Sequence, residues 1–251
     1  MSPEFFFMLN AVLASRLVFL FRDGPLTTGG VVMLLSIQFA GILCFQPGVG
    51  LAILLCLLIV TALMFHRLEK PHARNEGTRL LSLAVQIALL SVFFSPWIGI
   101  SFNSGLLASM TGIGKFTLIE SFLERLSRPG TSVVLMGGLL VVNEANHLLR
   151  ILLSGLRVGP QASPGGGTEM TAVDRREYNT GRVIGILERL IIYMAVMTGE
   201  IGAIGLVLAV KGLARFKEMD HRQFAEYVLV GTLLSALLAV FVALIVKSLI
   251  Q

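Results

Sequence analysis

Long apolar stretches alternate with short polar or Gly- and Pro-containing breaks along the whole chain. A helix needs about 20 mostly apolar residues to cross a bilayer. Seven stretches approach this length and composition, at 4–21, 29–45, 48–65, 80–100, 131–153, 181–212 and 224–250. The pattern predicts an all-α fold, a polytopic transmembrane helical bundle of seven or eight helices, embedded in a lipid bilayer.

The eighth helix depends on residues 104–128. This segment is moderately apolar but carries Lys115, Glu120, Glu124 and Arg125. Three interpretations remain open: an amphipathic helix in the membrane interface, a re-entrant element, or a span that lines a polar interior.

One segment reads as a linker. Residues 158–172 are dominated by Gly, Pro and Ser and show no periodicity. We therefore expect three parts: an N-terminal transmembrane region at 1–157, a flexible linker at 158–172, and a C-terminal two-helix transmembrane region at 173–251.

Composition supports the membrane class. The chain is 55% hydrophobic and only 14% charged, whereas soluble domains are about a quarter charged. The net charge of +5 comes from basic residues between the apolar stretches, where juxtamembrane Lys and Arg belong. Aromatic and basic residues do not interleave as they do in base-stacking surfaces, so we expect no nucleic-acid partner.

The stretch 181–212 carries charges at membrane depth. At about 100° per residue, positions 189, 193, 196, 200, 204, 207 and 211 fall on one helical stripe. Arg189, Tyr193, Glu200 and Lys211 lie on it. Ionisable groups in a membrane usually face protein or water. This stripe is the first candidate for a polar interior.

The basic loops give conflicting topologies. The segments 66–79, 150–182 and 211–222 hold four, five and four Lys or Arg residues. Cytoplasmic loops are enriched in such residues, yet 150–182 and 211–222 cannot share a side if 181–212 crosses once. The alternatives are one long tilted helix or a break at Gly199–Gly202. We favour the long helix, because each half is short for a span.

A second polar stripe lies at the end of the stretch 131–153, where Asn143, Asn146, His147 and Arg150 follow one helix face. Glu144 and His147 also have the E-x-x-H spacing of carboxylate-bridged metal sites. The same spacing recurs at 218–221 and at 69–72, where Pro71 forbids a regular helix. Because spacing alone does not make ligands converge, we expect no metal and no cofactor.

The last apolar stretch carries small residues every fourth position: Gly231, Ser235, Ala239 and Ala243. Small residues at this spacing let another helix approach closely. We interpret them as a helix-packing stripe, within the chain, with a membrane-protein partner or in a homo-oligomer.

The stretch 181–235 contains a further pattern, formed by Gly181, Ile184, Gly185, Leu187, Glu188, Arg189, Ala203, Ile204, Gly205, Lys211, Arg215, Phe216, Ala225, Glu226, Tyr227 and Gly231–Ser235. In these residues it resembles the C-terminal part of a family of uncharacterised bacterial integral membrane proteins. The resemblance implies a multi-pass protein of the bacterial inner membrane and supplies no activity. Among charged residues it singles out Glu188, Arg189 and Glu226.

Two functional hypotheses follow. The first is permeation or transport of an ion or small polar solute through a charged interior, with Arg189, Glu200 and Lys211 along the path. The second is a non-transporting scaffold or subunit of a membrane complex. The charges are explained more readily by an interhelical or interfacial ion-pair network that only stabilises the bundle. No P-loop, nucleophile elbow or dinucleotide fingerprint occurs, so an enzyme is the weaker class.

Overall fold

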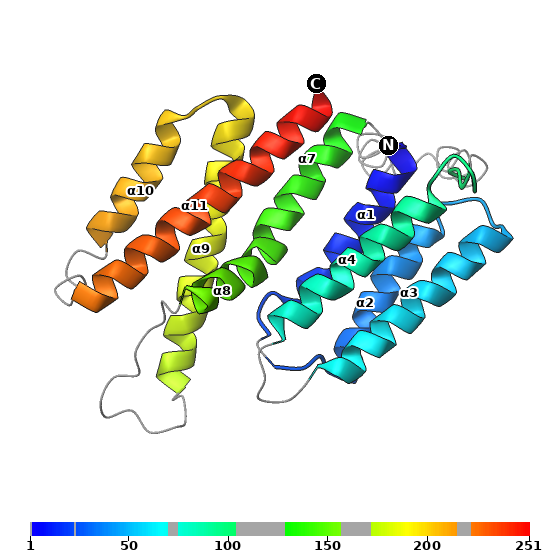
Figure 1. The fold of residues 1–251 in the computed structure, drawn as a ribbon, viewed down its shortest axis with the longest axis horizontal. Coiled ribbons are helices and arrows are strands. Elements are labelled where there is room, and N and C mark those ends of the chain that lie inside the picture. The colour runs from blue at the N-terminus through cyan, green and yellow to red at the C-terminus, as the bar shows by residue number, and fades with distance from the viewer. Residues whose placement is uncertain (1, 23, 70–74, 104–128, 157–171, 215–221) are drawn as a thin grey trace, which may run out of the picture. The chain divides into compact units, whose positions relative to one another are not determined.

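A computed structural model describes residues 2–22, 24–69, 75–103, 129–156, 172–214 and 222–251. All regular elements in these ranges are helical (Figure 1), and the predicted all-α class is confirmed. Counting the continuous stretch from Pro129 to Gly155 as one, the described part of the chain has eight helices. The ambiguous segment 104–128 and most of the predicted linker, 158–171, lie outside the described residues.

The chain divides into two compact units, Met1–Leu139 with Ile250 and Leu140–Leu249 with Gln251. We call them the first and the second unit. The division falls between Leu139 and Leu140, upstream of the linker expected at 158–172.

The first unit consists of α1 (Pro3–Ser15), which continues as the 3-10 helix η1 (Arg16–Phe19), α2 (Thr28–Ile42), α3 (Val49–Leu68), α4 (Glu76–Phe93) and α7 (Pro129–Leu139). Helix α1 packs against α2 and α7, and α3 packs against α4. The contact between α1 and α2 is close: a Cβ on Gly41 would lie 2.8 Å from the Cβ of Ala11. Glycine at this position therefore allows the two backbones to approach.

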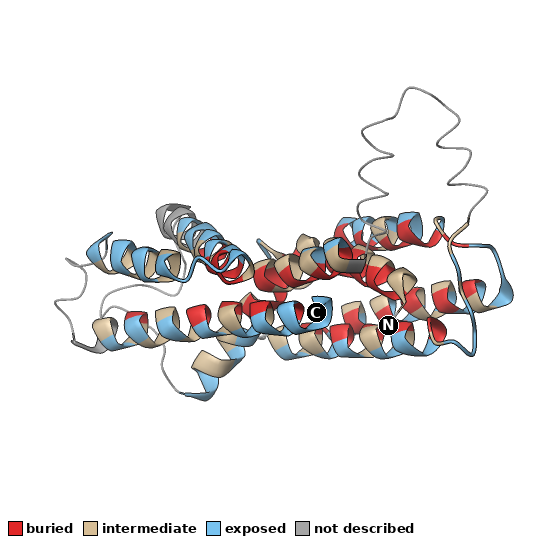
Figure 2. Cartoon of the chain, turned by 90° about the horizontal axis from the view of Figure 1, so that it is seen from above, coloured by how far each residue is buried: buried red, intermediate tan, exposed pale blue. Residues whose placement is uncertain are grey.

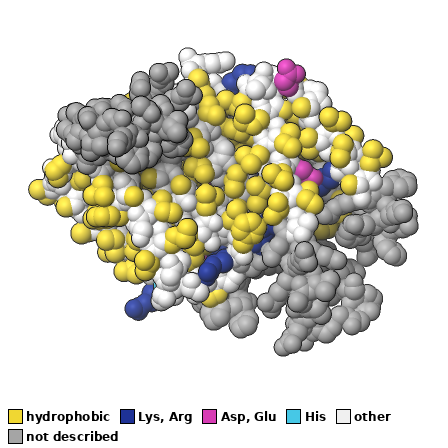
Figure 3. All heavy atoms as spheres, turned by 180° about the vertical axis from the view of Figure 1, so that it is seen from behind, with side chains coloured by type: hydrophobic (Ala, Val, Ile, Leu, Met, Phe, Trp, Pro, Cys, Tyr) yellow, Lys and Arg dark blue, Asp and Glu magenta, His cyan; other side chains and the backbone are white. Residues whose placement is uncertain are grey.

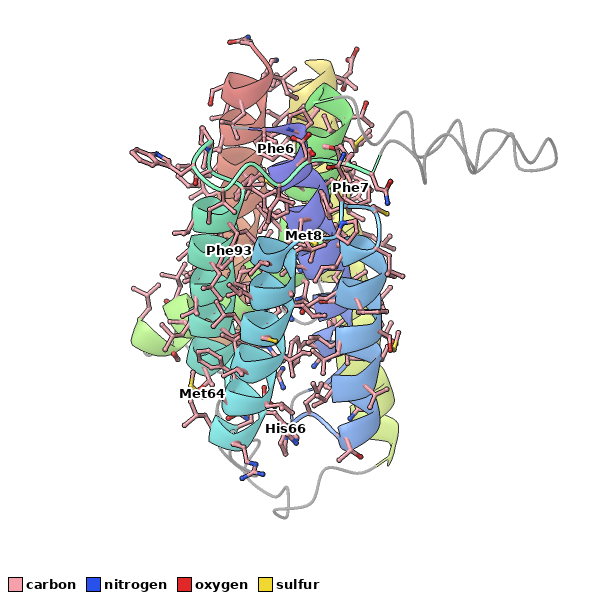
Figure 4. All side chains as sticks on the ribbon, turned by 90° about the vertical axis from the view of Figure 1, so that its right-hand side faces the viewer. Phe6, Phe7, Met8, Met64, His66 and Phe93 are labelled. Atoms are coloured by element: carbon pink, nitrogen blue, oxygen red, sulfur yellow. The ribbon has the colours of Figure 1, made fainter. Side chains whose placement is uncertain are left out.

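Aromatic rings close one end of the first unit. Phe45 stacks on Phe102 with centroids 5.1 Å apart, and Phe7 meets both rings edge-on at 5.9 and 5.4 Å. An isolated β-bridge between Phe45 and Phe102 holds the two segments together. Figure 4 shows Phe6 and Phe7 near this end and His66 near the opposite end of the helices.

The opposite end is held by a buried ion pair. The Arg79 Nε donates to Glu69 Oε1 at 2.8 Å, and its two terminal nitrogens donate to the carbonyls of Arg22 and Gly24 at 2.8 and 2.7 Å. Glu69 Oε2 accepts from the Leu26 amide at 2.7 Å. We call Glu69, Arg79 and the backbone groups of Arg22, Gly24 and Leu26 the arginine clamp. It ties the loop after η1 to the ends of α3 and α4.

The second unit consists of the π-helical turn η2 (Leu140–Glu144), α8 (Ala145–Gly155), α9 (Ala172–Thr198), α10 (Gly202–Ala214) and α11 (Arg222–Ile250). Helices α9 and α10 pack against each other. The region 173–251 was predicted to hold two helices and contains three.

The expectation of one long helix over 181–212 is wrong. Gly199 has a φ of +89°, a left-handed conformation that glycine adopts without the steric cost of a side chain. The Gly199 amide donates to the Val196 carbonyl and the Ala203 amide to the Glu200 carbonyl, which ends one helix and starts the next. The break at 199–202, left open as the alternative, is the one that the structure adopts.

Four described helices are long and apolar enough to cross a membrane: Val49–Leu68, Glu76–Phe93, Gly130–Gly155 and Ala225–Ile250. Two of the other predicted spans correspond to shorter apolar helices, Thr28–Ile42 and Gly202–Ala214. Buried and exposed residues alternate along individual helices (Figure 2), and hydrophobic side chains are spread widely over the face of the described residues that Figure 3 shows. These features are those of a membrane protein.

Candidate functional site

Arg189 on α9 is the centre of the predicted polar interior. Its side chain is 3% exposed. The Nε donates to the Val141 carbonyl at 3.1 Å, and Nη1 donates to the Ser235 hydroxyl on α11 at a long 3.4 Å. Nη2 is buried and has no hydrogen-bond partner within the described ranges. Arg189 thus connects three elements of the second unit and keeps unused donor capacity.

The Val141 carbonyl belongs to the π-helical turn η2. A π turn inserts one residue into an α-helix and lengthens the backbone hydrogen bonds from i→i+4 to i→i+5. Such turns disturb the regular ladder and recur at functional sites. Here the Arg189 guanidinium donates to a carbonyl of this turn, so the irregular backbone and the buried cation are in direct contact.

The same π turn buries polar side chains. Asn143 and Glu144 are 2% and 4% exposed, and the Asn143 Nδ2 donates to Glu144 Oε1 at 2.9 Å. His147, one turn further on α8, is 3% exposed. Asn146 and Arg150 are half-buried. On the predicted stripe, Asn143 and His147 are therefore buried, whereas Asn146 and Arg150 are partly accessible.

Only the first half of the stripe predicted on 181–212 lies on one helix face. Arg189, Tyr193 and Val196 are 3%, 1% and 4% exposed and share the buried face of α9. Glu200, expected at the centre of the interior, is exposed in the connection between α9 and α10. The prediction put Glu200 on the same helix face as Arg189. That face does not continue past Gly199, because helix α9 ends there.

Lys211 pairs with Glu188 and does not continue a stripe from Arg189. Its Nζ donates to Glu188 Oε2 across α9 and α10. The two side chains are 18% and 16% exposed. This ion pair is possible because α10 runs back along α9, which brings residue 211 next to residue 188. Glu226 is exposed on α11.

The predicted packing stripe on α11 is buried at three of its four positions. Ser235, Ala239 and Ala243 are 7%, 0% and 0% exposed. Gly231 is half-buried, and a Cβ there would meet nothing within 4 Å. Ser235 also accepts the Arg189 hydrogen bond, so it has a polar role in addition to its small size.

Within the part of the chain that the structure describes, the E-x-x-H pairs do not extend into larger ligand sets. Among the described residues, no group of three or more His, Cys, Asp or Glu side chains could hold a metal ion. Glu69 binds Arg79, its spaced partner His72 lies outside the described residues, and so does the pair at 218–221.

Sequence reasoning missed the polar end of the first unit. Arg79 was assigned only to the basic segment 66–79, and Glu69 to that segment and to an E-x-x-H pair. Arg16 lies within the apolar stretch 4–21, and no role was predicted for it. A usable signal was present on α4, where Arg79, Ser82 and Gln86 fall on one face of an otherwise apolar helix. All three are buried.

Comparisons with protein-family models, with curated proteins and with solved structures find no match. The resemblance of 181–235 to uncharacterised bacterial integral membrane proteins therefore stays a prediction.

Proposed function

We propose that the protein passes an ion or small polar solute through the polar interior of the second unit, with Arg189 as the residue that binds it. The observation that carries the proposal is the buried guanidinium of Arg189 with an unpartnered Nη2. Burying a cation costs several kcal/mol unless its charge and hydrogen bonds are compensated. A site that tolerates this cost is suited to a ligand that supplies the missing acceptor.

The groups that contact Arg189 favour an anion or an acceptor-rich solute. The two groups that accept from Arg189, a backbone carbonyl and a hydroxyl, are neutral. The adjacent carboxylate of Glu188 is engaged by Lys211. A diffusible anion or polar oxygen can therefore bind Arg189 by a charge-assisted hydrogen bond, which is stronger than a neutral one.

The test is flux into liposomes reconstituted with purified protein. Chloride, nitrate and small carboxylates serve as probe anions, and glycerol and urea as uncharged probes. We expect Arg189→Met to reduce the flux of a transported probe at least about tenfold, the effect of losing one charge-assisted hydrogen bond. Arg189→Lys should retain part of the flux, because it keeps the charge.

Glu200→Gln is the matched control. Helical periodicity predicted Glu200 along the path, but its exposed position in the α9–α10 connection predicts unchanged flux. Wild-type liposomes impermeable to every probe would overturn the proposal. So would Arg189→Met protein that elutes as a folded species and conducts like wild type.

The proposal places the protein in the bacterial inner membrane as a multi-pass protein. The support is the four candidate spans together with the resemblance of 181–235. Fractionation of a bacterial host that expresses the tagged chain tests this, and recovery in the outer membrane would contradict it.

The second candidate is a scaffold that self-associates through α10. None of the residues of this apolar helix is buried. Gly202, Gly205, Ala209 and Gly212 share one face, and a Cβ on any of these glycines would meet nothing within 4 Å. Such a face suits close packing of a second copy. Native mass spectrometry should then show a dimer for wild type and a monomer for Gly205→Leu.

A further inference from the structure

A pocket at the polar end of the first unit is independent of the Arg189 site. It lies where η1 and α3 end and α4 begins, and its empty volume is about 440 Å³ including its open mouth. Arg16, His66, Arg79 and Gln86 are among the side chains that line it.

The lining is positively charged. It includes two arginines and one carboxylate, Glu69. Both carboxylate oxygens of Glu69 accept hydrogen bonds within the arginine clamp, from Arg79 and from the Leu26 amide. Arg16 is 1% exposed and donates to the Ser82 hydroxyl and the Arg79 carbonyl, each at 2.8 Å.

Phe19 holds the two guanidinium groups near each other. The Arg16 and Arg79 Cζ atoms lie 5.4 and 4.5 Å from the centre of its ring. An aromatic face attracts cations and limits how far these side chains turn. The pocket therefore presents preorganised positive charge.

Two polar atoms in the lining residues are left without partners. Gln86 is 3% exposed, and its Oε1 has no hydrogen-bond partner in the part of the chain that is described. The buried Nδ1 of His66 is in the same situation. Buried polar groups are nearly always hydrogen-bonded, so the lack of partners for these two atoms requires an explanation. A ligand that donates as well as accepts hydrogen bonds would satisfy them.

We propose that this pocket binds a phosphate-class oxyanion that carries a proton or hydroxyl. The positive charges of Arg16 and Arg79 attract its oxygens, and its hydroxyl donates to Gln86 Oε1 or His66 Nδ1. The pocket lies at the ends of two candidate spans, Val49–Leu68 and Glu76–Phe93, where a free phosphate and a lipid headgroup are both within reach. The recognition chemistry is the same for the two sources.

The experiment begins with delipidated protein in detergent, titrated with inorganic phosphate and with sulfate by isothermal calorimetry at pH 7. Sulfate has no proton to donate at this pH, so phosphate should bind about tenfold more tightly, the equivalent of one hydrogen bond to a buried acceptor. A second arm uses native mass spectrometry of protein taken from vesicles of phosphatidylglycerol or of phosphatidylcholine.

The test variant is Gln86→Met, which keeps the side-chain length and removes the unpartnered oxygen. Gln38→Met is the matched control, because Gln38 is 1% exposed, has an unpartnered Oε1 among the described residues, and does not line the pocket. We expect Gln86→Met to weaken phosphate binding at least about tenfold and Gln38→Met to leave it unchanged. His66→Leu provides a second variant with the same expected direction.

Phosphate binding that depends on Gln86 supports a free oxyanion. Retention of phosphatidylglycerol that is lost in Gln86→Met supports a lipid headgroup. Binding of neither probe, equal affinity for phosphate and sulfate, or equal effects of the two glutamine variants would overturn the proposal. None of these outcomes depends on Arg189 or on solute flux.

Discussion

The two buried arginines Arg79 and Arg189 are equally inaccessible, at 4% and 3% exposure, but their surroundings differ. Arg79 uses all three of its nitrogens on a carboxylate and two carbonyls, at 2.7 to 2.8 Å, and packs on the Phe19 ring. Arg189 has one carbonyl, one long bond to a hydroxyl and one unpartnered nitrogen within the described residues. Burial alone therefore does not distinguish an arginine that only stabilises the fold from one that can bind a further acceptor.

The degree of hydrogen-bond saturation separates the two roles. A saturated guanidinium is held in place and stabilises the fold, because removing it would strand its partners. An under-satisfied guanidinium contributes less to stability and can take a further acceptor. Five substitutions test this difference, described from the largest expected change in the free energy of unfolding to a pair of serine substitutions with small effects.

Arg79→Met should be the most damaging. It leaves the Glu69 carboxylate buried without its cation and frees two loop carbonyls, which costs about 3–5 kcal/mol. Denaturant unfolding in detergent, followed by circular dichroism, measures the loss. Stability within about 1 kcal/mol of wild type would show that the clamp is not structural.

Glu69→Gln should cost about 2 kcal/mol, since it replaces charge-assisted hydrogen bonds by neutral ones and keeps the shape. The double variant with Arg79→Met completes a double-mutant cycle. If the two residues act as a pair, the double variant should lose less than the two single losses together. Additive losses would contradict the clamp.

Arg189→Met should change stability by no more than about 1 kcal/mol in either direction, because a poorly compensated buried cation is replaced by an apolar chain. The same unfolding assay measures it, and the flux assay shows whether function is lost. A loss as large as that of Arg79→Met would place Arg189 in the structural class.

Ser235→Ala should have the smallest effect, below about 0.5 kcal/mol, because the 3.4 Å bond to Arg189 is at the limit of hydrogen-bond geometry. Ser82→Ala is its counterpart in the first unit, since Ser82 accepts from Arg16 at 2.8 Å. We expect Ser82→Ala to cost about 1 kcal/mol. Equal losses of unfolding free energy for Ser235→Ala and Ser82→Ala would contradict the interpretation that the longer hydrogen bond is the weaker one.

Much of the helix placement followed from local pattern. The apolar stretches 29–45 and 48–65 correspond to α2 and α3, with breaks at Pro25 and at Gln46–Gly48, because length and turn residues are read directly from sequence. The face with Arg189, Tyr193 and Val196 also followed from helical periodicity. The same periodicity failed beyond Gly199, where it wrongly carried Glu200 and Lys211 onto that face.

By itself, the sequence determined the all-α class, the apolar helices and the residues that share a face within one helix, since these depend on neighbours three or four positions apart. The tertiary structure decided which helix ends where, and which charges meet. Gly-Glu-Ile-Gly is compatible with a continuing helix or a turn, and the packing of α10 on α9 with the Glu188–Lys211 pair accompanies the turn. The saturation of Arg79 and the unpartnered nitrogen of Arg189 depend on groups about 10 to 57 positions away, contacts that no local pattern encodes.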